Sequence, residues 1–431
     1  MKRNLSRYIY GVTLLVLAMG PTACKKNFTD PSSVPSQDAF GNPQAMTGVA
    51  IGLQRAYTAG RASSLFNRVV IDGILTNQLT VSNQGNVPEF QLQTGGGTVD
   101  GTNTMVNGLW TSSNKIIYDA DNVLNSARGL GDPAYASGLI GYTSIFKALA
   151  LGDIALFWEQ APASNGQNVA FQARTAALQR AIVTIDTALN RIAATPVPAS
   201  YTAVLPGGAA GIDIPNTLHA LKARYSLYLG NYATALAEAN LVDLTKKSVL
   251  VVNGTNPNPL FESLGGGNVT TMAATFGLPA GLQPDPADKR IPFYYSASTS
   301  SKMLGFGATS TTSYPLYLPG EMTLIKAEAY ARMTPPDLAN AVIELNKVVT
   351  KLRSADPFGI GAELPAVAPV GQQAILDEIY RQRGIELSLS GLRLEDMRRF
   401  ARPVAERKRS FLPYPFQERD NNPNTPPDPA F

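Results

Sequence analysis

The chain has 431 residues, of which only 16% are charged, and it contains one histidine and one cysteine. That count excludes His/Cys metal sites and a catalytic Cys–His pair, because each needs several such side chains. The net charge of +4 is too small to mark a nucleic-acid-binding surface.

The first 23 residues are typical of an export signal. Lys2, Arg3 and Arg7 precede an apolar run at 9–19, which is far shorter than the roughly 20 residues that span a bilayer. A basic head, a short apolar run and small residues at its end predict a signal peptide over 1–23. Its removal would lower the net charge from +4 to about +1.

Cys24 follows this segment directly, after the small residue Ala23. A disulfide is excluded because the chain has no second cysteine. Cleavage before Cys24 would leave its thiol at the new N-terminus for acylation, with palmitate among the expected chains, and several chains would anchor it firmly. Residues 24–45, broken by Pro31 and Pro35, then predict a lipid anchor and flexible tether.

Alanine-rich stretches with apolar residues at helical spacing follow at 109–130, 141–159, 218–242 and 321–353. The third breaks at Gly230 and the fourth at Pro335, which predicts two pairs of antiparallel helices. These two pairs share small and apolar residues at the same offsets, at Ala223, Tyr232 and Ala235 and at Ala329, Leu338 and Ala341. Small residues let two helices approach closely, so the pattern predicts tetratricopeptide-like repeats. Residues 109–159 and 175–192 offer weaker pairs.

Two long segments, 76–108 and 252–316, are rich in Gly, Pro, Asn and Thr. Long ordered loops in compact domains are usually functional. We therefore expect a helical scaffold that displays loop insertions.

The segment 375–403, ILDEIYRQRGIELSLSGLRLEDMRRFARP, resembles a signature of the SusD/RagB family of surface lipoproteins. The matching residues are Arg383, Glu386, Leu387, Gly391, Arg393, Asp396, Arg398 and Arg399. Gln382 and Ser390 replace two of the family's usual glutamates. The segments 150–162, 220–236 and 322–333 are also similar to family motifs, and so is the closing stretch 411–424 with Pro413, Pro415, Glu418 and Pro423.

The resemblance implies a mainly α, SusD-like fold over residues 46–431. In such a fold, tetratricopeptide-like helix pairs form a right-handed scaffold with a loop-rich ligand-binding side. It also implies a protein without catalysis, cofactor or metal that captures oligosaccharides, or another oligomeric nutrient such as peptide. The implied partner is a SusC-like TonB-dependent barrel in the outer membrane, on which the lipid-anchored protein would sit facing the exterior.

A glycan binder needs flat aromatic faces together with amide, carboxylate or guanidinium groups for the hydroxyls. The loop residues that offer these groups are Asn83, Gln84, Asn86, Phe90, Arg290, Tyr294 and Tyr295. Plain solvated surface is the alternative for each of them. Trp158, at the end of a helical stretch, is a further candidate, although core packing is favoured for it and for Trp110.

No pair of carboxylates stands out as the acid and base of a glycoside hydrolase. Glu395 and Asp396 belong to the family signature, and the basic run at 398–409 is interleaved with acids. We expect that run to be a salt-bridged helix end rather than an anion site. The main alternative function is a scaffold lipoprotein whose helical repeats bind only other proteins.

Overall fold

The computed structural model describes residues 40–264, 269–297 and 302–431. The predicted signal peptide, Cys24 and most of the tether lie outside these ranges. The first described helix, α3 (Pro43–Thr58), begins inside the predicted tether 24–45. Its start follows from local chemistry, because Oδ1 of Asn42 accepts the N–H of Ala45 at 2.7 Å and a proline opens the first turn.

The remaining elements alternate long helices with very short strands. The helices are α4 (Ser64–Leu75), α5 (Val87–Thr94), α6 (Thr104–Ala127), α7 (Pro133–Phe157), α8 (Arg174–Ala194), α9 (Ala199–Val204), α10 (Ile214–Tyr228), α11 (Tyr232–Asn240), α12 (Pro259–Leu264), α13 (Ile291–Tyr294), α14 (Pro319–Arg332), α15 (Leu338–Val349), α16 (Gln372–Glu386), α17 (Arg393–Arg399) and α18 (Phe416–Asn421). The strands are β1 (Leu79–Val81), β2 (Gln160–Pro162), β3 (Phe171–Ala173), β4 (Val249–Leu250), β5 (Thr270–Met272), β6 (Tyr295–Ser296), β7 (Lys302–Met303) and β8 (Tyr314–Pro315).

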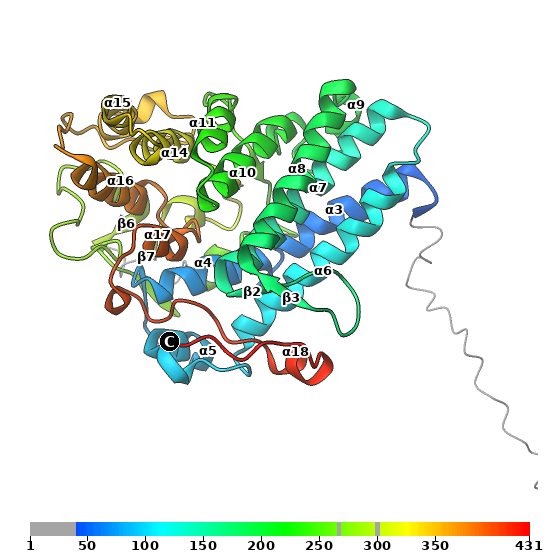
Figure 1. The fold of residues 1–431 in the computed structure, drawn as a ribbon, viewed down its shortest axis with the longest axis horizontal. Coiled ribbons are helices and arrows are strands. Elements are labelled where there is room, and N and C mark those ends of the chain that lie inside the picture. The colour runs from blue at the N-terminus through cyan, green and yellow to red at the C-terminus, as the bar shows by residue number, and fades with distance from the viewer. Residues whose placement is uncertain (1–39, 265–268, 298–301) are drawn as a thin grey trace, which may run out of the picture.

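The long helices form the scaffold, and each packs on the next from α6 to α8, through α10 and α11, to α14 and α15 (Figure 1). The predicted break in the third stretch is confirmed, since Gly230 takes a left-handed φ of 76° between α10 and α11. The small residues that predicted close helix approach, Ala223, Ala235, Ala329 and Ala341, are all fully buried. The expectation of a mainly α fold built on such pairs is confirmed.

Helix α7 is the centre of this scaffold. It is long and apolar enough to cross a membrane, yet 94% of its most apolar window is buried inside the protein. It packs between α6 and α8, so an interior position explains its composition.

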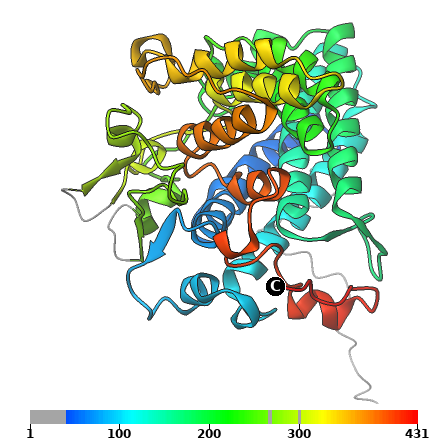
Figure 2. The same cartoon turned by 60° about the vertical axis from the view of Figure 1, so that its left-hand side comes forward.

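The two predicted loop insertions contain short elements and are less irregular than expected. Segment 76–108 holds β1 and α5, and segment 252–316 holds α12, α13 and the strands β5, β6, β7 and β8. The two segments meet because β1 pairs antiparallel with β5, with Thr80 opposite Thr271. Figure 2 shows these strands gathered on one side of the helices.

The signature segment 375–403 forms a buried network of ion pairs that joins α16 and α17 to the scaffold. Asp396 accepts from Nε of Arg383 at 2.9 Å and from Nη2 of Arg399 at 2.8 Å. Glu395 pairs in the same way with Arg174 and Arg398. The expectation that these charges serve structure is confirmed.

Candidate functional site

Trp158 cannot meet a ligand, because its side chain is 0% exposed. Its indole Nε1 donates to the carbonyl of Pro413 at 2.9 Å, and its ring packs edge-on against Trp110 with 4.8 Å between centroids. The prediction that placed Trp158 in the ligand site is wrong, whereas core packing of Trp110 and Trp158 is confirmed.

Arg290 and Tyr294 are also buried, so their prediction as ligand contacts is wrong. The Arg290 guanidinium forms ion pairs with Asp288 and Glu386, at 2.7 and 3.1 Å. The Tyr294 hydroxyl donates to the carbonyl of Glu386 at 2.8 Å. Both side chains fasten α13 to Glu386 at the end of α16, more than ninety residues further along the chain.

The remaining predicted residues lie nearer the surface. Asn83 and Gln84 are exposed in the turn before α5. Oδ1 of Asn83 accepts the N–H of Gly85 at 2.8 Å, and Nδ2 of Asn86 donates to the carbonyl of Asn83 at 3.1 Å, so both amides shape the turn. Phe90 and Tyr295 are half-buried against the core. Ligand contact by this group remains a prediction.

A better-formed site is a cleft between α6, the β2–β3 hairpin loop and α18, which we call the α6–α18 cleft. Its volume is about 460 Å³, within the range of about 300–1,000 Å³ that small-ligand sites occupy. It is lined by Trp110, Thr111, Asn114, Lys115, Tyr118, Pro162, Ser164, Asn165, Gly166, Val169, Pro415, Gln417, Glu418 and Asn421.

The floor of the cleft is fixed by an aromatic cluster. Trp110 stacks on Phe171 with 6.2 Å between centroids and meets Tyr414 edge-on at 5.8 Å. Burial raises the pKa of Tyr414 to about 12, so its hydroxyl stays protonated, and it accepts the N–H of Gln160 at 3.0 Å. These contacts make the floor rigid, since aromatic pairs of this geometry add to the burial of their rings.

Hydrogen bonds from both sides hold the hairpin loop that walls the cleft. Toward α6, Nδ2 of Asn165 donates to Oδ2 of Asp121 at 2.7 Å. Toward the C-terminus, Nδ2 of Asn422 donates to the carbonyl of Val169 at 3.0 Å. The three walls are therefore fixed relative to one another before a ligand binds. This lowers the entropy cost of binding.

The rim offers one exposed aromatic ring among amides. Tyr118 on α6 is 56% exposed, one turn of helix after Asn114. Gln417 and Asn421 face the cleft from α18, and Asn165 from the hairpin loop. The charged residues of the lining are already paired, because Lys115 binds Asp119 at 2.7 Å and Glu418 accepts from Trp110 and Asn422. A flat ring with amides suits a neutral, hydroxyl-rich ligand.

The sequence carries one signal for this cleft, and it lies on a helix outside the predicted loops. Tyr118 lies off the apolar face of its helix, which is formed by Leu109, Ile116 and Val123. An aromatic residue on the polar face of a helix is a candidate contact. The other walls come from segments 162–169 and 415–421, and only the fold brings these to α6. Among the described residues, no three metal-ligating side chains gather.

Comparisons with known proteins agree with this fold. The SusD family model matches residues 295–427. A SusD superfamily protein from Bacteroides fragilis superposes with a TM-score of 0.67 at 17% identity, covering 90% of this chain and 99% of that one. One from Parabacteroides distasonis gives 0.67 at 14% identity, covering 93% and 100%. No functionally curated protein matches the chain.

A further structural neighbour is a SusD-like carbohydrate binding protein from Bacteroides fragilis. It superposes with a TM-score of 0.63 at 14% identity and covers 84% of this chain and 87% of that one. At such identities the likeness extends to the fold, and the SusD family model carries the sequence relationship of the C-terminal segment. Together they confirm the resemblance to the SusD/RagB family that the motifs predicted.

Proposed function

We propose that this SusD/RagB family protein is a nutrient-binding lipoprotein that captures oligosaccharides in the α6–α18 cleft. The observation that carries the proposal is the exposed ring of Tyr118 among Asn114, Asn165 and Gln417, over a rigid aromatic floor. Sugar rings present C–H faces that pack on an aromatic ring, and their hydroxyls both donate to and accept from side-chain amides. The carbohydrate binding named for one structural neighbour supports the same ligand class.

The turn before α5 extends the proposed site. Helices α5 and α18 lie along the same edge of the molecule in both views (Figures 1 and 2). An oligosaccharide longer than the cleft would continue toward the exposed Gln84 and Asn83, with Asn86 and Phe90 following in the same turn and helix. In this proposal the cleft holds the end of the chain and the turn adds outer contacts.

Binding is tested by titrating the purified chain, without its first 23 residues, with soluble glycans and peptides in a calorimeter. Saturable binding of at least one oligosaccharide, lost on substitution in the cleft, supports the proposal. A chain that binds no glycan and no peptide would instead be the helical-repeat scaffold that binds only proteins.

Delivery to a TonB-dependent barrel completes the proposed role. It rests on the family resemblance and on the lipidation predicted at Cys24, which would hold the protein at the outer membrane with its cleft facing the exterior. The test is a pull-down of the tagged lipoprotein from its native outer membrane, followed by mass spectrometry of partners and of the N-terminal peptide. A stoichiometric barrel and an acylated Cys24 support it, and an unacylated chain without a barrel contradicts it.

A further inference from the structure

Three asparagines of the chain are followed directly by glycine, at Asn107, Asn165 and Asn253. Asparagine is chemically labile, and a following glycine leaves its peptide nitrogen accessible because it carries no Cβ. Asn107 lies inside α6, where helix hydrogen bonds engage the peptide N–H groups and hold the backbone. Asn165 and Asn253 lie in exposed loops. The structure therefore leaves two candidates for reaction.

The Asn165–Gly166 peptide is the less restrained of these two. Oδ1 of Asn253 accepts the N–H of Thr255 at 3.0 Å, which holds that carboxamide in a turn. Asn165 makes a single side-chain bond, from Nδ2 to Oδ2 of Asp121 at 2.7 Å. The N–H of Gly166 donates to no acceptor among the described residues, and its φ of 137° lies in a region that favours glycine. Its nitrogen is therefore free to approach Cγ of Asn165.

The hairpin loop that carries Asn165 is held differently on its two sides. On the C-terminal side, Nδ2 of Asn424 donates to the carbonyl of Asn168 at 2.8 Å, beside the bond to the carbonyl of Val169 described above. On the other side, the bond from Asn165 to Asp121 joins the loop to α6. Within the described part of the chain, no second hydrogen bond joins residues 163–170 to α6. The position of the loop against α6 therefore depends on one carboxamide.

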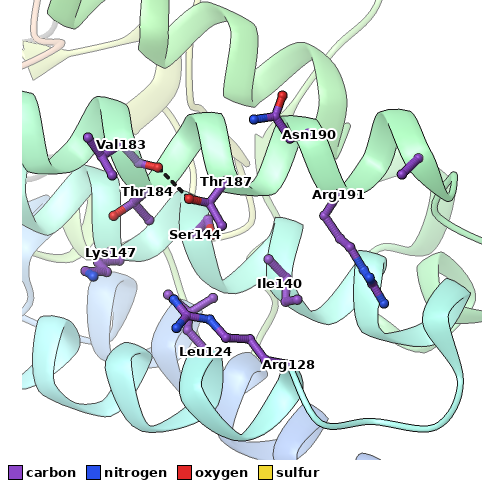
Figure 3. Close-up of a pocket in the computed structure, with 11 residues that line it drawn as sticks. Leu124, Arg128, Ile140, Ser144, Lys147, Val183, Thr184, Thr187, Asn190 and Arg191 are labelled. Atoms are coloured by element: carbon purple, nitrogen blue, oxygen red, sulfur yellow. Dashed lines mark hydrogen bonds between the residues drawn. The ribbon is translucent and has the colours of Figure 1, made fainter.

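The charges around Asp121 make a carboxylate at position 165 unfavourable. Asp121 forms an ion pair at 2.6 Å with Lys147, which comes from α7 and lines a second hollow of about 580 Å³ between α6, α7 and α8 (Figure 3). Arg180 lies within electrostatic range of Asp121, but its guanidinium donates to the carbonyl of Pro162 at 2.6 Å. Both cations are already engaged. An acid in place of Asn165 would face Asp121 with like charge.

We propose that Asn165 is a site of spontaneous deamidation, and that its conversion releases the hairpin loop from α6. The peptide nitrogen of Gly166 attacks Cγ of Asn165 and passes its proton to the departing amide. The N–Cγ bond forms, the Cγ–Nδ2 bond breaks, and ammonia leaves. Water then opens the cyclic imide, its hydroxyl adding to either imide carbonyl carbon and its proton going to the ring nitrogen. The product carries aspartate or isoaspartate at this position, with one added negative charge.

The released loop would remain bound to the C-terminal segment while its contact with α6 is lost. The α6–α18 cleft would then have a wall that is no longer fixed before binding, so its affinity for a ligand should fall. This consequence for affinity rests on the proposed function. The deamidation and the release of the loop do not.

The first test is incubation of the folded chain, without its first 23 residues, in mildly alkaline buffer, followed by peptide mass spectrometry. Base removes the peptide proton and so speeds ring closure. We expect the mass gain of amide-to-acid conversion at Asn165, at least as fast as at Asn253 and several-fold faster than at Asn107. In urea, which unfolds α6, Asn107 should convert as well. Absence of conversion at Asn165 over a period in which Asn253 converts would overturn the proposal.

The second test measures release of the loop by backbone hydrogen exchange over residues 163–170. Asn165→Asp reproduces one product, Asn165→Ala removes the hydrogen bond without adding charge, and Asn253→Asp adds the same charge to a loop outside the cleft lining. Exchange should be several-fold faster in Asn165→Asp than in Asn165→Ala, and unchanged in Asn253→Asp. The difference should shrink in high salt, which screens exposed charges. Exchange in Asn165→Asp no faster than in the wild type would contradict release.

Calorimetry then separates this inference from the proposed function. Asn165→Asp should weaken oligosaccharide binding several-fold relative to the wild type, whereas Asn253→Asp should leave it unchanged. A wild type that binds no glycan would remove the proposed function, while faster exchange in Asn165→Asp would still support release of the loop. Equal glycan affinity of Asn165→Asp and the wild type would contradict the effect of deamidation on the cleft.

Discussion

The indole Nε1 of Trp110 donates a hydrogen bond to Oε2 of Glu418 at 3.1 Å, across 308 positions of sequence. The bond joins α6 to α18 at the base of the α6–α18 cleft. Glu418 also accepts from Nδ2 of Asn422 at 3.0 Å, so one carboxylate fixes both the floor and the C-terminal wall. The two residues give the cleft its shape before any ligand arrives.

Glu418→Ala should therefore loosen α18. The indole N–H of Trp110 would lose its partner, and a buried donor left unpaired costs about 1–3 kcal/mol. Glu418→Gln keeps an acceptor for the indole and should cost less. Urea unfolding of the two variants and the wild type measures the difference, and equal losses of unfolding free energy in both would contradict this role.

Tyr118→Ala tests the proposed contact with glycan. The exposed ring contributes little to the core, so the unfolding free energy should change by less than about 0.5 kcal/mol. Affinity for a bound oligosaccharide should fall about tenfold or more, because stacking and apolar burial on the ring are lost. Phe416→Ala is the matched control, since Phe416 is an exposed aromatic residue of α18 outside the cleft lining. Equal effects of the two substitutions would remove Tyr118 from the site.

Gln382→Glu would restore the glutamate that the SusD/RagB family usually carries, and we expect it to destabilise this chain. The Gln382 amide accepts from Arg290 and donates to Oε1 of Glu378 at 2.7 Å. The network around it already holds Asp288, Glu386 and Asp356 against Arg290 and Lys351. A further buried carboxylate would repel these acids and lose the donor to Glu378, at about 1–3 kcal/mol.

The measurement is urea unfolding of the Gln382→Glu variant at pH 7 and pH 5. The deficit should shrink at pH 5, where the introduced carboxyl takes up a proton more readily and can donate to Glu378. A variant as stable as the wild type at pH 7 would show that the network has room for the family's usual charge.

Local patterns were enough to predict the scaffold. The spacing of Ala223 and Ala235, and of Ala329 and Ala341, reports helix contacts that are close in sequence, and all four side chains are buried as expected. A structural role could also be predicted for the acids of the 375–403 signature. Asp396 and Arg399 are three residues apart on one helix, which is a spacing that allows an ion pair.

The candidate site depended on contacts that no local pattern contains. Arg290 stands in a proline-rich stretch that resembles exposed loop, yet its partner Glu386 lies on a distant helix. Trp158 is buried by Pro413, which comes from the far end of the chain. The cleft combines α6 with segments about fifty and three hundred residues further on, so its composition could not be seen before the fold was known.

Asp396→Asn should be strongly destabilising. Burial alone would raise the pKa of this carboxyl, but Arg383 and Arg399 outweigh burial and hold its pKa below the ordinary value. Removing the charge leaves the buried guanidinium of Arg383 without its ion pair and Arg399 with Glu328 alone, which costs about 3–5 kcal/mol. Asp420→Asn, on the surface of α18, should be nearly neutral.

The same carboxyl gives a pH signature. Since its folded pKa is lowered, its stabilisation is present above the unfolded pKa and is lost as the pH falls through the folded value. Urea unfolding between pH 5 and pH 2 should show a wild-type advantage over Asp396→Asn that shrinks toward acid. An advantage that stays constant over this range would contradict the charge pairing.

Asp153 should have the opposite pH dependence. Burial raises its pKa to about 6, because the nearest cation, Nη1 of Arg68, lies 3.5 Å from Oδ1, and Oδ2 has no partner among the described residues. The ordinary value in an unfolded chain is about 3.9. Between these two values the folded state binds more protons than the unfolded state, so the contribution of Asp153 to stability falls as the pH rises from about 4 to about 6.

Asp153→Asn removes this titration. It leaves the titration of Asp72, whose pKa is also raised to about 6 by burial. The wild type should therefore lose stability relative to Asp153→Asn between pH 4 and pH 7, by up to about 3 kcal/mol. Urea unfolding of both proteins across this range gives the difference directly. If the wild type instead gained stability relative to Asp153→Asn as the pH rose, the ionised Asp153 would act as a stabilising ion pair with Arg68, and the prediction would be wrong.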